Sequence, residues 1–591
     1  MTKINILKIF LLAVVFIVIL TLLSGCSLLN SGLLGINSDI SKDQQQTDPS
    51  ATATDSVIKS TVNETTEPVP ANFYFDEIIP EYIKDSISIE LKKDFENFHR
   101  AATRETADIL IEIVPAESDS SNYKNSLMYV PVVSFWSFFE ESSSKDFIGY
   151  WNGSMGTLKD ITGKEFEPEL IIRSPDLEII EKALGKCKVK QIKIARNEEE
   201  LTPLLENNIN SFSIIPFNEI NPKLKPVNLD GFDVFDKNLA IANYPITFKI
   251  AVKGEDAGLV EKAKVSLGNA SFSNRDLSKL VTVVMTGVTA MARQLARGMD
   301  INGTKYPAEK VVDILKNADI THISNEVSFV EGCDAGKRGT VFCSKPEYME
   351  LLKYVDTDVI ELTGNHLNDY GSKWLAYTLD IYDREGIPYF GGGRNLEDSY
   401  KPATFEINGY KIAFVGANSF GPSSNWAGKD TPGSAKINMW DEVEMEKDLQ
   451  KFESLVKKLK NEGYIVIFTF QYMESNSYKP LAQQVEDFRR ISDAGAIIVS
   501  GSQAHQPMGV EFRDNGFINY GLGNLFFGQA AGLGVKQGII AKHIFYDGRY
   551  INTVLITTMV ELIENYCQPR PTYGTERAEL LKSIFDGKAK Q

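Results

Sequence analysis

The sequence predicts an α/β fold with two folded domains: a smaller α/β domain, then a sandwich of two mixed sheets flanked by helices. Three observations support this. With 591 residues, the chain is too long for one hydrophobic core. Short apolar runs alternate with amphipathic segments, which is typical of parallel strands joined by helices. In the second half, Asn-Gly and Asp-Gly pairs between apolar runs add antiparallel hairpins.

The first 26 residues have the pattern of an export signal. Lys3 and Lys8 form a basic start, residues 9–23 are apolar apart from one threonine, and Leu-Ser-Gly precedes Cys26. These last four residues resemble a bacterial lipobox, which implies that Cys26 is lipidated; the alternative is an uncleaved membrane anchor. Both place the chain at the extracytoplasmic face of the cell membrane. Residues 27–70, rich in Ser, Thr, Gln, Asp and Asn, are predicted to be a disordered tether.

Residues 71–255 are predicted to form the smaller α/β domain. Its strands are expected at residues 109–114, 127–133, 170–172, 189–195 and 212–216. The aromatic-rich stretch at residues 130–155 resembles extracellular solute-binding proteins of the phosphate or molybdate type, which implies a degenerate form of that fold. Residues 256–279 are expected to be a polar, partly helical connector.

Charge and cysteine content restrict the partners and the compartment. The formal net charge of −17 argues against nucleic acid as a general partner. Cys333 and Cys343 lie ten residues apart across a loop rich in Gly, Asp and Lys, and export permits disulfides, so we expect a bridge between them. No CxxC or nearby His pair accompanies them, which disfavours zinc. The pairing of Cys187 and Cys567 is left open.

The second domain, residues 280–565, is predicted to carry the functional site at the ends of five strands. The strands are expected at residues 281–286, 320–324, 359–363, 465–470 and 496–500. Ligands in open α/β sheets collect beyond the carboxyl ends of strands, so we expect the strand exits to converge on one crevice. These exits are Gly287-Val288, Asn325-Glu326, Gly364-Asn365-His366, Gln471 to Glu474 and Gly501 to His505. Residues 566–591 are expected to form a C-terminal tail.

Five motifs of this domain together resemble the CapA family of capsule-synthesis proteins. They are GNHLNDYG, SNEVSF, the Asn408-Gly409 hairpin followed by IAFVG, DAGAIIVSGSQAH, and FINYGLGNLFF. The resemblance covers roughly residues 280–546. It implies a calcineurin-like metallophosphoesterase fold and an association with poly-γ-glutamate capsules.

Three positions depart from the family pattern, and all three are usual metal-ligand positions. Val288 stands where the family has Asp, and Gln471 and Gln503 stand where it has His. A two-metal phosphoesterase holds its ions with bridging carboxylates and imidazoles, and the loss of one Asp and two His removes an anionic ligand and two nitrogen donors. The residues therefore predict at most one ion, with Mn, Mg or Ca favoured over Zn. A site without any metal is the alternative.

The predicted roles follow from the surviving residues. A catalytic role is predicted for His366, Glu326, Glu474 and Asp369, because an imidazole beside carboxylates can transfer protons near neutral pH. The predicted ligands of a single metal ion are Asn325, Asn365, His505, Gln503 and Gln471. Asn524 and Trp426 are predicted to bind substrate.

The resemblance and the export signal together predict an exported lipoprotein of the CapA type. It would act in the synthesis, handling or anchoring of a capsule or extracellular polymer such as poly-γ-glutamate, in one form as a hydrolase with a reduced metal site. The predicted partners are the membrane through a lipid anchor, an extracellular anionic polymer and membrane-bound polymer synthase subunits. The alternative is a non-catalytic lipoprotein that binds the polymer or captures a solute.

Overall fold

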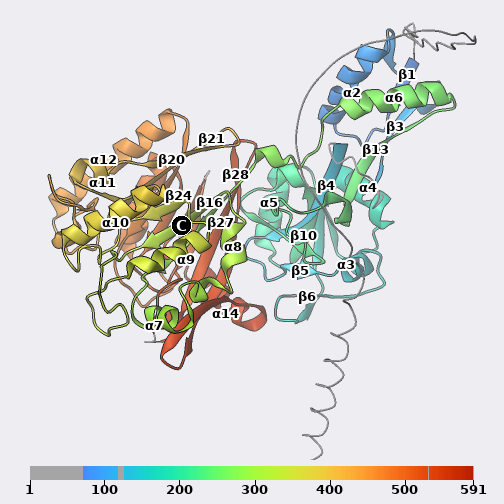
Figure 1. Cartoon of the computed structure of the whole chain (residues 1–591). Coiled ribbons are helices and arrows are strands. Elements are labelled where there is room, and N and C mark those ends of the chain that lie inside the picture. The colour runs from blue at the N-terminus through green and yellow to red at the C-terminus, as the bar shows by residue number, and fades with distance from the viewer. Residues whose placement is uncertain (1–70, 117–124, 515, 530–531, 590–591) are drawn as a thin grey trace, which may run out of the picture. The chain divides into compact units, whose positions relative to one another are not determined.

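The structure is a computed structural model that describes residues 71–116, 125–514, 516–529 and 532–589 (Figure 1). The predicted signal segment, Cys26 and the tether lie outside the described residues. Within the described ranges, no helix combines the length and the apolar character needed to cross a membrane.

The first domain is built on a mixed sheet with the strand order β2-β1-β3-β13-β4-β10-β8-β9, to which β11 adds by pairing with β4. Its strands are β1 (Ala71–Phe75), β2 (Phe98–Arg100), β3 (Ile109–Pro115), β4 (Ser126–Ser134), β8 (Glu169–Arg173), β9 (Ile192–Ala195), β10 (Ser211–Pro216), β11 (Leu224–Pro226) and β13 (Thr247–Lys253). Two short pairs stand apart, β5 (Glu141–Ser142) with β12 (Asn228–Leu229) and β6 (Leu158–Lys159) with β7 (Glu165–Phe166). The helices are α2 (Glu81–Asp94), α3 (Ser144–Trp151), α4 (Ser174–Leu184), α5 (Glu198–Asn207) and α6 (Ala257–Asn269).

The segment predicted as a connector is largely a helix of the first domain. Helix α6 packs against α2, and its Ala263 and Leu267 are buried in the core of this domain. Asp256 starts the helix by accepting hydrogen bonds from the backbone N–H groups of Gly258 and Leu259. The polar residues that suggested a connector cover the exposed face of this helix.

The second domain contains two large sheets. The first has the order β18-β17-β16-β14-β27-β28-β29, with β15 added beside β16. It consists of β14 (Leu280–Met285), β15 (Val288–Thr289), β16 (Ile320–Asn325), β17 (Val359–Glu361), β18 (Tyr389–Phe390), β27 (Gln537–Tyr546), β28 (Arg549–Ile563) and β29 (Tyr566–Pro571). The second has the order β20-β21-β23-β24-β26-β25. It consists of β20 (Ala403–Ile407), β21 (Tyr410–Asn418), β23 (Tyr464–Gln471), β24 (Ala496–Ser502), β25 (Val510–Arg513) and β26 (Gly516–Asn519). A short pair, β19 (Gly392–Gly393) with β22 (Gly433–Ser434), lies outside both.

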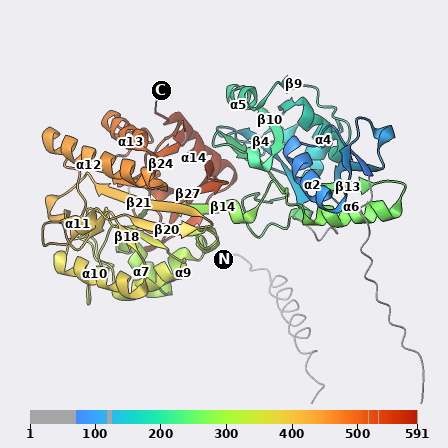
Figure 2. The same ribbon diagram turned by 90° about the horizontal axis from the view of Figure 1, so that it is seen from above.

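The two sheets pack face to face, and helices cover their outer faces (Figure 2). Val283 of the first sheet and Phe414 and Ile467 of the second share one buried core. The first sheet is covered by α7 (Arg293–Asn302), α8 (Val312–Lys316), α9 (Met349–Tyr354) and α10 (Ser372–Glu385). The second is covered by α12 (Glu442–Asn461) and α13 (Ala482–Ala494), while the short α11 (Leu396–Ser399) lies beside β19 and β22. The predicted sandwich of two mixed sheets flanked by helices is thus confirmed.

The hairpin expected at Asn408-Gly409 joins β20 to β21. Both residues have positive φ angles, 50° at Asn408 and 80° at Gly409, as a type I′ turn requires. Asp547 and Gly548 repeat this at the turn between β27 and β28, with φ angles of 50° and 78°.

The C-terminal segment is part of the fold instead of a tail. Strand β29 pairs with β28 along its length. Helix α14 (Gly574–Asp586) buries Leu580, Leu581 and Ile584 in the core between the sheets. Prolines at residues 569 and 571 argue against a strand in the sequence, but prolines are tolerated in an edge strand such as β29.

The structure joins Cys333 and Cys343 by a disulfide bond. Cys187 and Cys567 are free thiols, the first half-buried and the second buried.

Candidate functional site

The site is centred on Glu326, the residue that follows β16. Its side chain is buried, with 1% of its surface exposed. The neighbouring strand β17 leads to Gly364, which lies directly against Glu326: a Cβ atom on Gly364 would fall 2.3 Å from the Cβ of Glu326. Glycine is therefore required for the two strand exits to approach this closely.

Gln471, at the end of β23, links the second sheet to Glu326. Its amide nitrogen Nε2 lies 3.3 Å from Glu326 Oε2 and 3.2 Å from Asn365 Oδ1, and it also donates to Gln503 Oε1. Its amide oxygen accepts a hydrogen bond of 2.5 Å from the Ser502 hydroxyl. The amide orientation follows from these partners, because three oxygen acceptors face the nitrogen.

Gln503 and His505 follow β24 and have strained backbone conformations. Their φ angles are 75° and 53°, in the left-handed region that residues other than glycine rarely occupy. His505 is held by a 2.8 Å hydrogen bond between its Nδ1 and Asn524 Oδ1. Strain of this kind persists where the surrounding structure fixes it, and it is common at functional sites.

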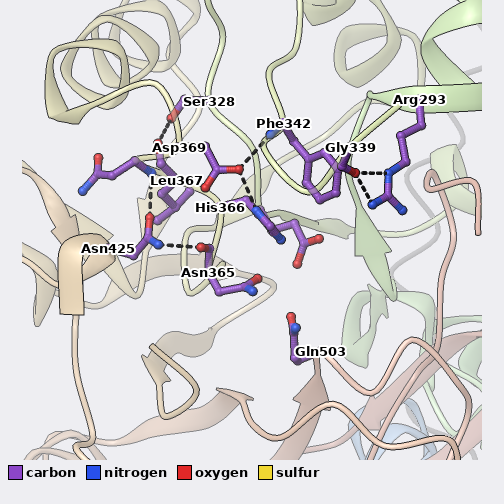
Figure 3. Close-up of polar contacts among 12 residues, drawn as sticks. Arg293, Ser328, Gly339, Phe342, Asn365, His366, Leu367, Asp369, Asn425 and Gln503 are labelled. Carbon is purple, nitrogen blue, oxygen red and sulfur yellow. Dashed lines mark hydrogen bonds and ion pairs between the residues drawn. The ribbon is translucent and has the colours of Figure 1, made fainter. Parts of the chain in front are cut away.

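His366 is oriented by Asp369 (Figure 3). The Nδ1 of His366 lies 2.7 Å from Asp369 Oδ2, and the same oxygen accepts the backbone N–H of Phe342. Burial disfavours the charged imidazole, but the hydrogen bond to Asp369 and the negative charge of Glu326 outweigh it and raise the pKa of His366. With Nδ1 occupied, Nε2 is the nitrogen left for a ligand.

Arg293 is a site residue that the sequence did not reveal. Its φ angle is 53°, and its guanidinium donates two hydrogen bonds to the backbone oxygen of Gly339 (Figure 3). The guanidinium also lies 4.3 Å from the centroid of the Phe342 ring, which in turn lies 4.3 Å from the His366 ring. Burial lowers the pKa of Arg293, while the charge of Glu326 opposes this. Arg293 therefore brings a second cation to the site.

One carboxylate oxygen of Glu326 is unpartnered. Its Oε1 is buried and has no hydrogen-bond partner among the described residues. Glu474 is exposed, and its negative charge raises the pKa of Arg293. The ring of Phe527 lies 5.5 Å from the Arg293 guanidinium and 5.4 Å from the His505 ring. An unpaired buried carboxylate oxygen beside two cations can receive an N–H donor of a ligand.

Three predicted site residues have other tasks in the structure. The amide of Asn325 donates to the hydroxyl of Tyr382 on α10 and to the backbone oxygen of Val327, so it links β16 to a helix instead of facing Glu326. Asn524 is buried and orients His505. The indole N–H of Trp426 donates to Asn418 Oδ1 at 3.0 Å. The Oδ1 of Asn325, the atom that would bind a metal, is buried and has no hydrogen-bond partner among the described residues. The side chains of Asn524 and Trp426 are tied to His505 and Asn418.

The remaining predicted metal ligands do not fit a metal ion in this arrangement. Glu326, Asn365 and Gln503 turn their oxygens toward one point, but the amide nitrogen of Gln471 occupies that point. A donor group thus takes the place that a cation would need. No group of three or more His, Cys, Asp or Glu side chains within the described part of the chain is arranged to hold a metal.

Gln471→Glu is expected to create a cation site. The new carboxylate would face three oxygens, so the variant should unfold at a lower temperature than the parent in EDTA. Mn²⁺ or Ca²⁺ should restore much of that loss, because an oxygen-rich set suits a hard cation. Thermal unfolding with and without each ion measures both effects.

The parent protein is the control, and its melting temperature should not respond to either ion. A parent that is stabilised by Mn²⁺ as strongly as the variant would show that Gln471 does not replace the cation.

The second domain is an α/β domain of two sheets, and its candidate site lies where parallel strands of both sheets end. Residues 282–529 match the family model described as bacterial capsule synthesis protein PGA_cap. The capsule biosynthesis protein CapA of Bacillus anthracis is 25% identical over 293 residues, 48% of this chain and 69% of that protein. The PGA biosynthesis protein CapA of Bacillus subtilis (strain 168) is 24% identical over 316 residues, 53% of this chain and 78% of that protein. The second domain of this chain is thus similar to CapA capsule synthesis proteins.

Solved structures give weaker matches. An ABC-type phosphate transport receptor from Vibrio cholerae is 12% identical, covers 34% of this chain and 93% of its own, and superposes with a TM-score of 0.27. A phosphate-binding protein of an ABC transporter from Clostridium perfringens is 12% identical in sequence and superposes with a TM-score of 0.24.

Proposed function

We propose that this protein acts in the synthesis, handling or anchoring of an extracellular anionic polymer of the poly-γ-glutamate type. The names of the two CapA relatives refer to capsule and PGA biosynthesis, and this supports the polymer. The lipid anchor at Cys26 would hold the site at the extracytoplasmic face of the membrane. Membrane-bound synthase subunits would deliver the polymer there.

The observation that carries the proposal is the charge pattern around Glu326. A γ-linked glutamate backbone repeats two groups, an amide N–H and a free carboxylate. The unpartnered Oε1 of Glu326 can accept the N–H, and Arg293 and protonated His366 can hold the carboxylate. The same arrangement would not recognise a neutral polysaccharide in this way, since a sugar offers no carboxylate to the two cations.

The site is also proposed to cleave the polymer, with proton transfer by His366 and Glu326. His366 offers Nε2 as the acid, because Asp369 holds its Nδ1. Glu326 accepts the proton of a water molecule whose oxygen adds to the amide carbonyl carbon, and His366 gives its Nε2 proton to the amide nitrogen as the C–N bond breaks. We propose that no metal takes part, because the amide of Gln471 fills the point on which the ligand oxygens converge.

Binding and cleavage of poly-γ-glutamate test the proposal. The purified chain should retain the polymer in a pull-down assay, and size-exclusion chromatography should show shorter polymer after incubation. His366→Gln should abolish cleavage and weaken binding about tenfold, because it removes a cation from the carboxylate. His99→Gln, at an exposed histidine of the first domain, is the matched control. Equal binding and cleavage by both variants would refute the proposed site, and binding without cleavage would leave a polymer-binding protein.

A further inference from the structure

A cleft in the first domain has a charge pattern of its own. It has a volume of about 570 Å³ and is lined by the loop before α2, the starts of α2, α4 and α5, and β4. Carboxylates outnumber cations on its walls. The acidic residues are Glu77, Glu81, Asp176, Glu198 and Glu219, and the basic ones are Lys84, Arg173 and Arg196.

The cations of the cleft are already paired. Arg173 donates from Nε to Asp176 Oδ2, and its Nη2 lies 2.5 Å from a carboxylate oxygen of Glu219. Lys84 pairs with Glu81 at 2.9 Å, and Arg196 pairs with Glu200 at 3.0 Å. The guanidinium of Arg173 therefore has little left to offer an oxyanion.

The helix N-termini at the cleft are also electrostatically unfavourable for anions. A helix N-terminus attracts anions through its free backbone N–H groups. Here α2, α4 and α5 each carry a carboxylate in the first turn: Glu81, Asp176 and Glu198. Pro175 in addition removes a backbone N–H at the start of α4. A bound phosphate or molybdate would thus meet negative charge at every one of these helices.

Tyr129 gives an independent sign of a ligand. Only 2% of its surface is exposed, and its hydroxyl has no hydrogen-bond partner among the described residues. Tyr129, Asp176 and Glu219 line the same cleft. Burial raises the pKa of Tyr129, and the charges of Asp176 and Glu219 raise it further. A hydroxyl that lacks a partner and lines a cavity is suited to a ligand that donates a hydrogen bond.

We propose that this cleft binds a small organic cation through its ammonium group. Asp176 and Glu219 share the single cation Arg173 and so leave one negative charge between them, and Glu198 adds another. The hydroxyl of Tyr129 accepts an ammonium N–H. The ring of Tyr129 adds an aromatic surface, which attracts cations. The proposal is independent of the polymer site in the second domain.

Isothermal titration of the whole purified chain with spermidine and with inorganic phosphate tests the proposal. Spermidine should bind and phosphate should not. Tyr129→Phe keeps the ring and removes a hydroxyl that bonds to nothing in the protein, so the variant should fold and should bind spermidine about fivefold more weakly. Glu198→Gln, at an exposed residue, should weaken binding about threefold.

Glu199→Gln is the matched control, because Glu199 lies in the same helical turn but does not line the cleft. It should leave spermidine binding unchanged. Equal affinity in the parent and all three variants would show that spermidine is only a counterion on the acidic surface. Binding of phosphate in place of spermidine, or no binding of either, would also overturn the proposal.

Discussion

Gly364→Ala is expected to lower the free energy of unfolding by about 3 kcal/mol and to dismantle the site. The added Cβ would lie 2.3 Å from the Cβ and 2.4 Å from the Cα of Glu326. Backbone cannot give way as a flexible side chain can, so the ends of β16 and β17 would have to separate. The urea midpoint of unfolding should fall, and polymer binding should be lost.

Gly298→Ala is the control for this prediction. Gly298 lies inside helix α7, and a Cβ there would meet its nearest atoms at 3.4 Å, which is ordinary contact. Alanine favours a helix over glycine by up to about 1 kcal/mol, so this variant should be as stable as the parent or more stable. If Gly364→Ala unfolds at the same urea concentration as Gly298→Ala, the two strand ends do not approach as closely as described.

Glu326→Gln is expected to have the largest effect on function without loss of fold. The amide keeps the shape of the side chain but loses the charge that faces His366 and Arg293. Polymer binding should weaken by about 10-fold to 100-fold, the loss expected for a hydrogen bond to a charged group. The melting temperature should stay the same or rise, because an incompletely paired buried charge is removed.

The same variant should change the dependence on pH. The charge of Glu326 helps to raise the pKa of His366, so binding by the imidazolium is complete below that pKa and is lost as the pH rises through it. In Glu326→Gln the loss should begin at lower pH. Glu331→Gln, at an exposed residue that accepts a hydrogen bond from the Tyr377 hydroxyl, is the control. An unchanged pH profile in Glu326→Gln would show that Glu326 does not raise the pKa of His366.

Much of the fold could be predicted because local patterns and tertiary structure agree. The Asn408-Gly409 turn has one favoured conformation, and the strands before Glu326 and His366 are apolar runs that end abruptly. Helix α14 and strand β29 are harder to predict from the sequence. Their apolar residues find a partner only in segments far away in the sequence, so neither looks like a core element by itself.

The site could be predicted only in part, because sequence does not give side-chain direction. Asn325 and Glu326 are neighbours, and successive side chains of a strand point to opposite faces, so one turns to Tyr382 and the other to the site. Arg293 is brought in by the backbone oxygen of Gly339, 46 residues away. The orientation of the Gln471 amide depends on Ser502, a residue of the next strand.

Polymer binding by metal-free protein is the most direct test of the site described here. The chain should be stripped with EDTA, its metal content measured by elemental analysis, and its binding and cleavage of poly-γ-glutamate compared with untreated protein. We expect the two samples to act equally, and Mn²⁺ to add nothing. Loss of binding or cleavage in the stripped protein, with recovery on adding Mn²⁺, would show that the site requires a metal ion.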